Sequence, residues 1–406
     1  MATNNLAAVS QVSALTAQQN ILCEADGSVR RITVENLRKQ MATDIVYPSY
    51  TLEQSSNPEF SVHDSAALSS YMAEVGGYML RISSGKVYAA KLNPENWNYF
   101  ADGTAVDNAA KYECMVHLPT FHFKASGKTM TIGGLSPIDG GHTFEAPHWV
   151  GAYEGYIADS ALHSRPDVSP SHSQTMSGFW SYAQKLGTEW GLANYQFHCL
   201  INCLFQAKYG NLNSQAVIGT GGQMSDWKSW RDVKMGYGRG LGDGSGSAAT
   251  SMDGQNCVKL FGFEDLWGKL WEFRPGIRFY YSDSTRHAVV YDGNVVSNTA
   301  TGRDFTIPVL NASGAYVTKM QLGEYWDMVP IAVGGGSTTY YCDGYYDASG
   351  GELLGVGGYA GDVARCGVSY AISAYSFSYP RTIITSRLAF YGEPDAIVSG
   401  SKLITL

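Results

Sequence analysis

The loss of helical periodicity after Gly210 constrains the fold more than any other feature of this sequence. Two amphipathic segments precede it, over residues 175–186 and 194–210, and Asn194 stands where a helix N-cap is expected. From there to the C-terminus, short apolar runs alternate with glycine-rich loops such as residues 236–254. Glycine makes up 46 of the 406 residues, about 11% against a usual level of about 7%. The pattern predicts an α+β fold in which two helices are followed by short strands and long loops.

The first 45 residues are predicted to form a separate element. An alanine- and glutamine-rich amphipathic stretch leads to two short strands around the turn dipeptide Asp26-Gly27, and a helix is expected over residues 34–41. A piece of this size buries too little apolar surface to fold alone. We therefore expect residues 1–45 to serve attachment or oligomerisation.

Two further regions follow. Residues 46–108 are predicted to be a small β module, with a hairpin over residues 76–92 whose apolar residues alternate on both sides of a Ser-Gly turn. Residues 109–406 are predicted to form one large domain.

Charge and apolar patterning exclude several classes of partner. The net charge is −8 and no basic cluster occurs, which argues against nucleic acid. No apolar run approaches the ~18–20 residues of a membrane span, so no membrane insertion is expected. The start of the chain lacks the basic and apolar regions of a secretory signal.

The cysteines and histidines indicate neither a disulfide framework nor a metal site. Seven cysteines occur without the two-residue spacing of a zinc or redox motif, and Cys199 and Cys203 are expected to be core thiols in a protein that folds in a reducing compartment. His117 and His122 bracket a proline turn without an HExxH pattern, and no GxSxG nucleophile motif is present. We therefore assign no catalytic residue, no metal ligand and no cofactor.

Residues 353–392 lack several types of amino acid. They contain no Lys, Glu, Gln, Met or Trp, and no Asn occurs after Asn311. One explanation is a buried β region built of small residues. The other is adenine-directed mutagenesis of an Asn-rich template, because replacing the two adenines of an Asn codon never yields a codon for those five residues. Both explanations stay open at this point.

Tyrosine is concentrated in the same part of the chain. Nine of the 27 tyrosines lie between Tyr340 and Tyr391, where lysine is absent. Enrichment in Tyr, Ser and Gly with depletion of Lys is typical of antibody-like binding surfaces. The alternation of inward- and outward-facing side chains along a strand predicts that Tyr370 and Phe390 belong to the core.

Several segments resemble phage tail proteins. The stretch from Gly357-Gly358 to Arg387-Leu388-Ala389-Phe390 resembles the variable region of retroelement-diversified proteins, the phage tropism determinants among them. The segment FGFEDLWGKLWEF (residues 261–273) is similar to part of the formylglycine-generating branch of the C-type lectin fold. Further segments resemble phage tail or structural proteins: residues 24–41, 91–106, 149–162 and 193–221.

The resemblance implies a receptor-binding phage tail protein, not an enzyme. It implies a C-type-lectin-like domain, a homotrimer, a location in the virion after assembly in the host cytoplasm, and a bacterial cell-surface receptor, protein or glycan, as ligand. The N-terminus would join other phage tail or baseplate proteins. Two alternatives stay open: a purely structural tail or baseplate protein, and a formylglycine-generating oxidase, although Cys342 and Cys366 do not match the reactive cysteine pair of that branch.

The same resemblance places the diversified ligand contacts in a variable region of about residues 338–390. Of these contacts, Tyr359, Tyr375 and Tyr379 are expected to be exposed. The full predicted set is Tyr340, Tyr345, Tyr346, Tyr359, Ala360, Asp362, Val363, Arg365, Ser369, Ala371, Ser373, Ala374, Tyr375, Tyr379, Arg381 and Thr382.

Overall fold

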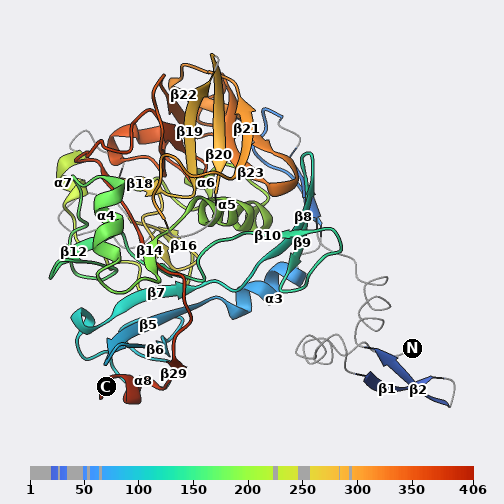
Figure 1. Ribbon diagram of the computed structural model, residues 1–406, viewed down its shortest axis with the longest axis vertical. Helices are drawn as coiled ribbons and strands as arrows, with labels where there is room; N and C mark the ends of the chain where they lie inside the picture. The colour runs from blue at the N-terminus through green and yellow to red at the C-terminus, as the bar shows by residue number, and fades with distance from the viewer. Residues whose placement is uncertain are drawn as a thin grey trace. The chain divides into compact units, whose positions relative to one another are not determined.

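The computed structural model of the chain describes residues 20–25, 28–33, 49–52, 55–63, 66–222, 227–245, 257–282, 284–291 and 295–406 (Figure 1). The chain divides into two compact units, residues 1–47 and 48–406. In the first unit, β1 (Asn20–Ala25) and β2 (Ser28–Thr33) pair as an antiparallel hairpin, which confirms the two predicted strands. The predicted stretch before residue 20 and the helix over 34–41 lie outside the described residues.

The second unit contains two seven-stranded sheets. The first has the order β14-β28-β11-β7-β5-β6-β29, and its pairs are antiparallel except for β6 with β29. Its strands are β5 (Gly76–Ser83), β6 (Lys86–Lys91), β7 (Glu113–His117), β11 (Trp149–Gly151), β14 (Trp190–Leu192), β28 (Leu388–Phe390) and β29 (Ala396–Ile397).

The predicted hairpin over residues 76–92 is confirmed as β5 and β6. Ser84 and Gly85 join the strands with φ of 52° and 74°, the positive values that a two-residue hairpin turn requires. Strand β5 also pairs with β7, so the hairpin shares a sheet with strands from residues 109–406. The division of this unit at residue 108 stays a prediction.

The second large sheet carries most of the predicted variable region. Its order is β23-β22-β24-β26-β25-β18-β27, so the parallel pair β24 and β26 lies inside the sheet. Its strands are β18 (Trp271–Arg274), β22 (Ser313–Leu322), β23 (Asp327–Val333), β24 (Gly344–Asp347), β25 (Leu354–Val356), β26 (Ala371–Ser373) and β27 (Ile384–Thr385).

Helix α5 (Tyr195–Tyr209) is almost entirely buried and lies below β20 and β23 in the view of Figure 1. The Asn194 side chain accepts a hydrogen bond from the Phe197 amide at 2.9 Å, and Gly210 ends the helix with a φ of 58°. Both predicted ends are therefore confirmed. The other predicted helix is α4 (Met176–Ala183), which begins after its cap Thr175 and stops short of the predicted residue 186.

Smaller sheets and short helices complete the unit. The further strands are β3 (Ser49–Thr51), β4 (Val62–His63), β8 (His122–Ser126), β9 (Thr129–Gly134), β10 (His142–Thr143), β12 (Tyr156–Ala158), β13 (Ala161–His163), β15 (Gly244–Ser245), β16 (Val258–Leu260), β17 (Phe263–Glu264), β19 (Ile277–Ser282), β20 (Thr285–Val290) and β21 (Arg303–Ile307). The further helices are α3 (Ala66–Glu74), α6 (Ser214–Val217), α7 (Trp227–Arg231), α8 (Gly400–Leu403) and the 3₁₀ turns η1 (Ala109–Lys111), η2 (Gly323–Tyr325) and η3 (Ala360–Arg365).

The segment of residues 384–390 joins the two large sheets. Its first part, β27, pairs with β18 of the second sheet, and its last part, β28, lies between β11 and β14 of the first. Arg387 stands between the two strands and is fully buried. Its guanidinium donates to the Gly151 carbonyl at 3.0 Å, the Glu264 carbonyl at 2.7 Å and the Glu272 carboxylate at 2.6 Å. One side chain thus connects strands from both sheets.

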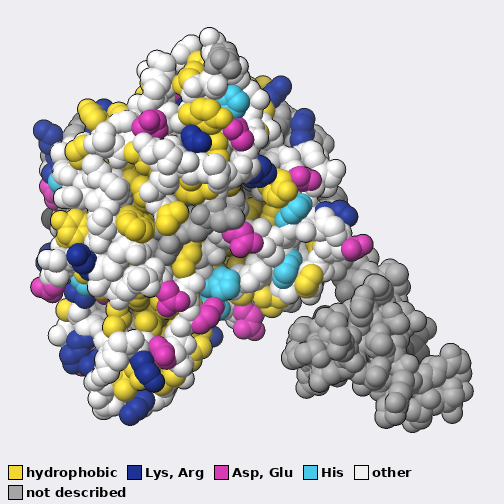
Figure 2. All heavy atoms as spheres, viewed as in Figure 1, with side chains coloured by type: hydrophobic (Ala, Val, Ile, Leu, Met, Phe, Trp, Pro, Cys, Tyr) yellow, Lys and Arg dark blue, Asp and Glu magenta, His cyan; other side chains and the backbone are white. Residues whose placement is uncertain are grey.

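The fold class is α+β, dominated by strands, as predicted. Across the described ranges, no helix has both the length and the apolar character needed to cross a membrane. On the face drawn in Figure 2, basic side chains lie at separate positions among acidic and hydrophobic ones. That face therefore lacks the continuous basic stripe typical of a nucleic-acid-binding surface.

Candidate ligand-binding face

The candidate site is a group of aromatic and arginine side chains around Trp271, the first residue of β18. The Trp271 indole is buried, with ring centroids of Tyr359 at 5.2 Å, Tyr375 at 5.9 Å and Tyr370 at 6.3 Å. Tyr370 in turn lies 6.3 Å from Tyr346. Trp271 and Tyr370 are buried, whereas the other three tyrosines are half-buried, so the two buried rings form a floor beneath them.

Asp362 lies beside this floor and fixes its orientation. Its carboxylate accepts a hydrogen bond from the Trp271 indole nitrogen at 2.7 Å and one from the Tyr359 amide at 3.2 Å. Burial raises the pKa of Asp362 to about 6. The contact ties η3 to β18, although the two elements are far apart in the sequence.

The most exposed part of the group is a stack of three side chains. The rings of Tyr375 and Tyr379 are nearly parallel, at an interplanar angle of 9° and a centroid distance of 5.3 Å. The Arg381 guanidinium lies over both rings, 4.4 Å from Tyr375 and 5.0 Å from Tyr379. Tyr379 is 45% exposed. Stacking holds the guanidinium in place while leaving it accessible to solvent.

Arg365 and Tyr346 form the opposite part of the group. The Arg365 Nε donates to the Gly314 carbonyl at 2.8 Å. Gly314 has a φ of 73°, and a Cβ there would collide with the Tyr346 hydroxyl oxygen. A glycine is thus needed for β22 to approach these two side chains. We call Tyr346, Tyr359, Arg365, Tyr375, Tyr379 and Arg381 the aromatic face.

Backbone strain occurs next to the aromatic face. Val363 in η3 is 38% exposed and has a φ of 46°, which is rare for a β-branched residue. The Gln215 side-chain amide donates to the Val363 carbonyl at 3.1 Å and so supports the turn. Strained residues of this kind concentrate at functional sites.

Ten of the sixteen predicted contacts are at least partly accessible. Val363, Tyr379 and Thr382 are exposed. Tyr340 lies apart from the aromatic face, because its amide donates to the Ser56 carbonyl and its ring packs against another core cluster. The half-buried members are Tyr340, Tyr346, Tyr359, Arg365, Ala374, Tyr375 and Arg381.

The other six predicted contacts are buried, so they do not form part of the accessible surface. They are Tyr345, Ala360, Asp362, Ser369, Ala371 and Ser373. Tyr345 lies in β24, and Ala371 and Ser373 lie in β26, two strands inside the sheet. Ala360 and Asp362 lie in η3, where Asp362 turns inward to the Trp271 indole, and Ser369 lies just before β26. The expectation of exposure for Tyr379 is confirmed, Tyr359 and Tyr375 are half-buried, and Tyr370 and Phe390 are in the core as predicted.

Two polar networks hold the buried residues. The buried Arg286 in β20 donates to the Tyr345 hydroxyl at 3.2 Å, to Asp347 at 2.8 Å and to the Ser373 hydroxyl at 2.6 Å. Separately, the Ser369 hydroxyl donates to Asn202 of α5 at 2.7 Å. These side chains position the strands beneath the aromatic face.

Trp271 and Arg286 were not among the predicted site residues. Trp271 lies outside the tyrosine-rich segment, and nothing in its spacing indicates that it meets Tyr359 and Tyr375. Arg286 lies 87 positions before its partner Ser373, and the sequence carries no signal for that contact.

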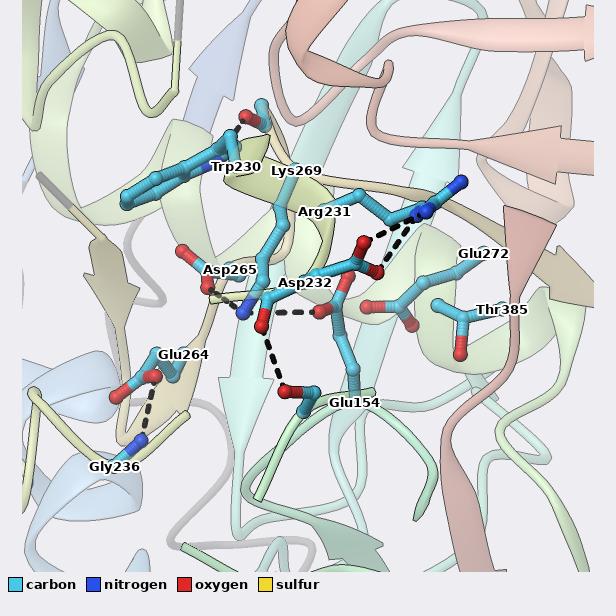
Figure 3. A network of polar contacts seen from close by, with 12 residues as sticks. Glu154, Trp230, Arg231, Asp232, Gly236, Glu264, Asp265, Lys269, Glu272 and Thr385 are labelled. Atoms are coloured by element: carbon cyan, nitrogen blue, oxygen red, sulfur yellow. Dashed lines mark hydrogen bonds and ion pairs between the residues drawn. The ribbon is translucent and has the colours of Figure 1, made fainter. Parts of the chain in front are cut away.

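A buried charge cluster lies next to the start of β18 (Figure 3). The Lys269 ammonium is 3.2 Å from the Asp265 carboxylate and 3.5 Å from that of Glu154. Burial would lower the pKa of Lys269, but these carboxylates raise it above its ordinary value. Burial raises the pKa of Glu154 to about 8, and both of its oxygens lack hydrogen-bond partners. The cluster is enclosed and supports the scaffold.

The cysteines with described side chains are all buried, and none of them forms a disulfide. Burial raises the pKa of the thiols of five of them, namely Cys114, Cys199, Cys203, Cys342 and Cys366. These five thiols are therefore in the neutral form at pH 7, which is less nucleophilic than the thiolate.

Two grooves lie away from the aromatic face. One has a volume of 560 Å³ and includes His142, Arg303 and Tyr325 in its lining, and another of 470 Å³ includes Tyr50, Phe60 and Leu212. Neither contains a predicted contact residue. No family model matches this chain, and no curated protein is found to be similar to it.

Proposed function

We propose that this chain is a receptor-binding protein of a phage tail and that the aromatic face binds a molecule on a bacterial surface. The observation that carries the proposal is the accessible stack of Tyr375, Tyr379 and Arg381 over the buried Trp271 floor. Tyrosine offers a large amphipathic contact area with few rotamers to immobilise, and Arg and aromatic residues dominate binding energy at protein interfaces.

The arrangement of the scaffold supports the proposal. The residues of the aromatic face come mainly from loops and η3. The buried Arg286 and Arg387 hold the same part of the chain in place through hydrogen bonds to Ser373 and Glu272. A surface supported in this way tolerates changes of its exposed side chains, because stability resides in the buried contacts. The order of α4 and α5 before a loop-rich region of short strands is what a C-type-lectin-like domain would have.

The proposal includes diversification of the aromatic face by a retroelement. A near-copy of the 3′ end of the gene, differing at adenines and beside a reverse transcriptase, is expected in the surrounding DNA. We expect its differences to fall on codons of the accessible positions and to spare those of buried residues such as Tyr345 and Ser373. The absence of any such repeat would contradict diversification, although binding by the face could still hold.

Binding to cells tests the function itself. Fluorescently labelled full-length protein is added to a panel of bacterial strains, and we expect it to bind at least one strain. The change Tyr379→Ala should reduce that binding about tenfold or more, the scale of a binding hot spot. The matched control is Tyr99→Ala, because Tyr99 is also 45% exposed but lies outside the face. Equal binding by both variants would contradict the proposal.

The alternatives predict different outcomes. A purely structural tail or baseplate protein would bind none of the strains. A formylglycine-generating oxidase would oxidise a cysteine-containing peptide in the presence of copper, which the proposed adhesin would not do. In the proposed assembly, a homotrimer displayed in several copies on the virion would convert weak single contacts into strong attachment.

A further inference from the structure

We infer that the ligand of the aromatic face is a protein that presents carboxylate side chains to Arg365 and Arg381. The inference rests on the proposed function and adds the chemistry of the partner. It depends on the distribution of charge, on the environment of the two arginines and on the shape of the face.

The charge of the aromatic face is opposite to that of the whole chain. The chain has a net charge of −8, yet the accessible charged groups of the face are the guanidinium groups of Arg365 and Arg381. Three acidic residues of the region, Asp343, Asp347 and Asp362, are buried. The face therefore presents positive charge on an acidic protein, an arrangement that attracts a negatively charged partner.

Glu352 is an acidic residue of the same region that is only half-buried. Its carboxylate accepts a hydrogen bond from the Phe377 amide at 3.2 Å, in the loop that leads to Tyr379. No ion pair joins Glu352 to Arg381 within the described residues. The positive charge of Arg381 is therefore not cancelled by this carboxylate.

Arg381 lacks a carboxylate partner among the residues that the structure describes. Within the described part of the chain it forms no ion pair. Its Nε is buried, so a ligand would meet the terminal nitrogens of the half-buried guanidinium. Elsewhere, arginines such as Arg286, Arg303 and Arg387 each pair with a carboxylate of the protein itself. The planar guanidinium of Arg381 is held by two tyrosine rings, which is the geometry suited to receive a carboxylate in two parallel hydrogen bonds.

The form of the face favours a protein over a glycan. Neither of the two grooves described above includes a residue of the face, which presents stacked rings and arginines. Tyr, Trp and Arg enrichment with Lys depletion is the composition of protein–protein interfaces. An acidic protein surface supplies carboxylates for the two guanidinium groups and apolar area for the rings at the same time.

Selection of short random peptides displayed on a carrier tests the inference. The full-length protein is immobilised, and recovered peptides are sequenced and compared with the unselected library. We expect Asp and Glu to be enriched at least about twofold, and binding of the recovered peptides to fall about tenfold or more with Arg381→Gln. Binding should also weaken as the salt concentration rises from about 0.05 to 0.5 M.

The control is Arg278→Gln. Arg278 also lies over a tyrosine ring, 4.6 Å from the centroid of Tyr280, but outside the aromatic face. This change should leave peptide binding unaltered. The far-ultraviolet circular dichroism and melting temperature of both variants are compared with the wild type, and Arg365→Gln provides a second variant if Arg381→Gln fails to fold.

The outcomes separate the inference from the proposed function. Recovered peptides whose binding is lost with Tyr379→Ala, but which are not enriched in Asp and Glu, would overturn the inference. The proposed function of the face would then still hold. An array of neutral and acidic oligosaccharides is the second arm, and binding there without any recovered peptide would replace the protein partner by a glycan. Peptides unaffected by Tyr379→Ala would overturn both the inference and the proposed function.

Discussion

Arg387 and Glu272 form a fully buried ion pair, with 2.6 Å between the Arg387 Nη2 and the Glu272 Oε1. The Arg387 Nε adds contacts of 3.1 Å to both carboxylate oxygens, and Arg274 approaches the same carboxylate at 2.8 Å. Burial alone would raise the pKa of Glu272, but the two guanidinium groups hold it below its ordinary value. The pair lies where the two large sheets meet.

The first prediction concerns the stability that depends on this pair. Glu272→Gln should lower the free energy of unfolding by about 3–5 kcal/mol, because it leaves the Arg387 and Arg274 charges buried without a carboxylate. Urea unfolding of the full-length protein measures the change. Lys111→Gln is the control: it removes the exposed pair with Asp107 and should cost less than about 1 kcal/mol. Equal effects of the two changes would contradict the assigned role of Glu272.

The second prediction concerns Glu154, which is as fully buried as Glu272 but has a raised pKa where that of Glu272 is lowered. Burial raises the pKa of Glu154 to about 8, so the side chain is mostly protonated at pH 7 and resembles a neutral amide in charge. Glu154→Gln should therefore change the free energy of unfolding at pH 7 by less than about 1 kcal/mol. A loss comparable with that of Glu272→Gln would mean that Glu154 is ionised and that its attraction to Lys269 is essential.

The helices and the β5–β6 hairpin could be predicted because their signals are local. Asn194 and Gly210 mark the ends of α5 through contacts within a few residues, and Ser84-Gly85 provides the turn between β5 and β6. The burial of Tyr345 and Ser373 could not be predicted in this way. Alternation separates inner from outer residues only where one face of a strand meets solvent, and β26 is buried along its whole length. In β24 alternation does hold, with Tyr345 buried and Tyr346 half-buried, but it does not by itself say which of the two faces the core.

Only part of the candidate site could be predicted from the sequence, for a related reason. Composition pointed to Tyr375 and Tyr379 because they lie within one tyrosine-rich segment. Trp271 lies about a hundred residues earlier in the chain and reaches that segment through the pairing of β18 with β25 and β27. Such long-range pairing depends on the whole sheet, so no local pattern around Trp271 reveals it.

The third prediction is a dependence of stability on pH that originates at Asp362. Burial raises its pKa to about 6, whereas an unfolded Asp titrates near 3.9. The folded protein therefore binds this proton more tightly than the unfolded chain, and the contribution of Asp362 to stability falls as the pH rises from about 4 to about 6. The full difference is about 3 kcal/mol at 1.36 kcal/mol per unit of pKa.

The comparison of wild type with Asp362→Asn isolates this effect from other titrating groups. The asparagine keeps an oxygen that accepts from Trp271 and Tyr359 but does not ionise. Denaturant unfolding between pH 4 and pH 7 should show the variant gaining stability relative to the wild type as the pH rises. A constant difference across this range would show that the folded and unfolded pKa of Asp362 are the same.

The last prediction separates positions that tolerate diversification from positions that do not. Ser373 is fully buried and accepts a hydrogen bond from Arg286 at 2.6 Å, whereas Thr382 is exposed. Ser373→Tyr should destabilise the protein by about 3 kcal/mol or more, because it overfills the core and removes a partner of a buried charge. Thr382→Tyr should change the free energy of unfolding by no more than about 0.5 kcal/mol. Thermal and urea unfolding of both variants give the comparison. If Ser373→Tyr were as stable as Thr382→Tyr, β26 would not be enclosed as described, and Ser373 would return to the set of positions that can vary at the surface.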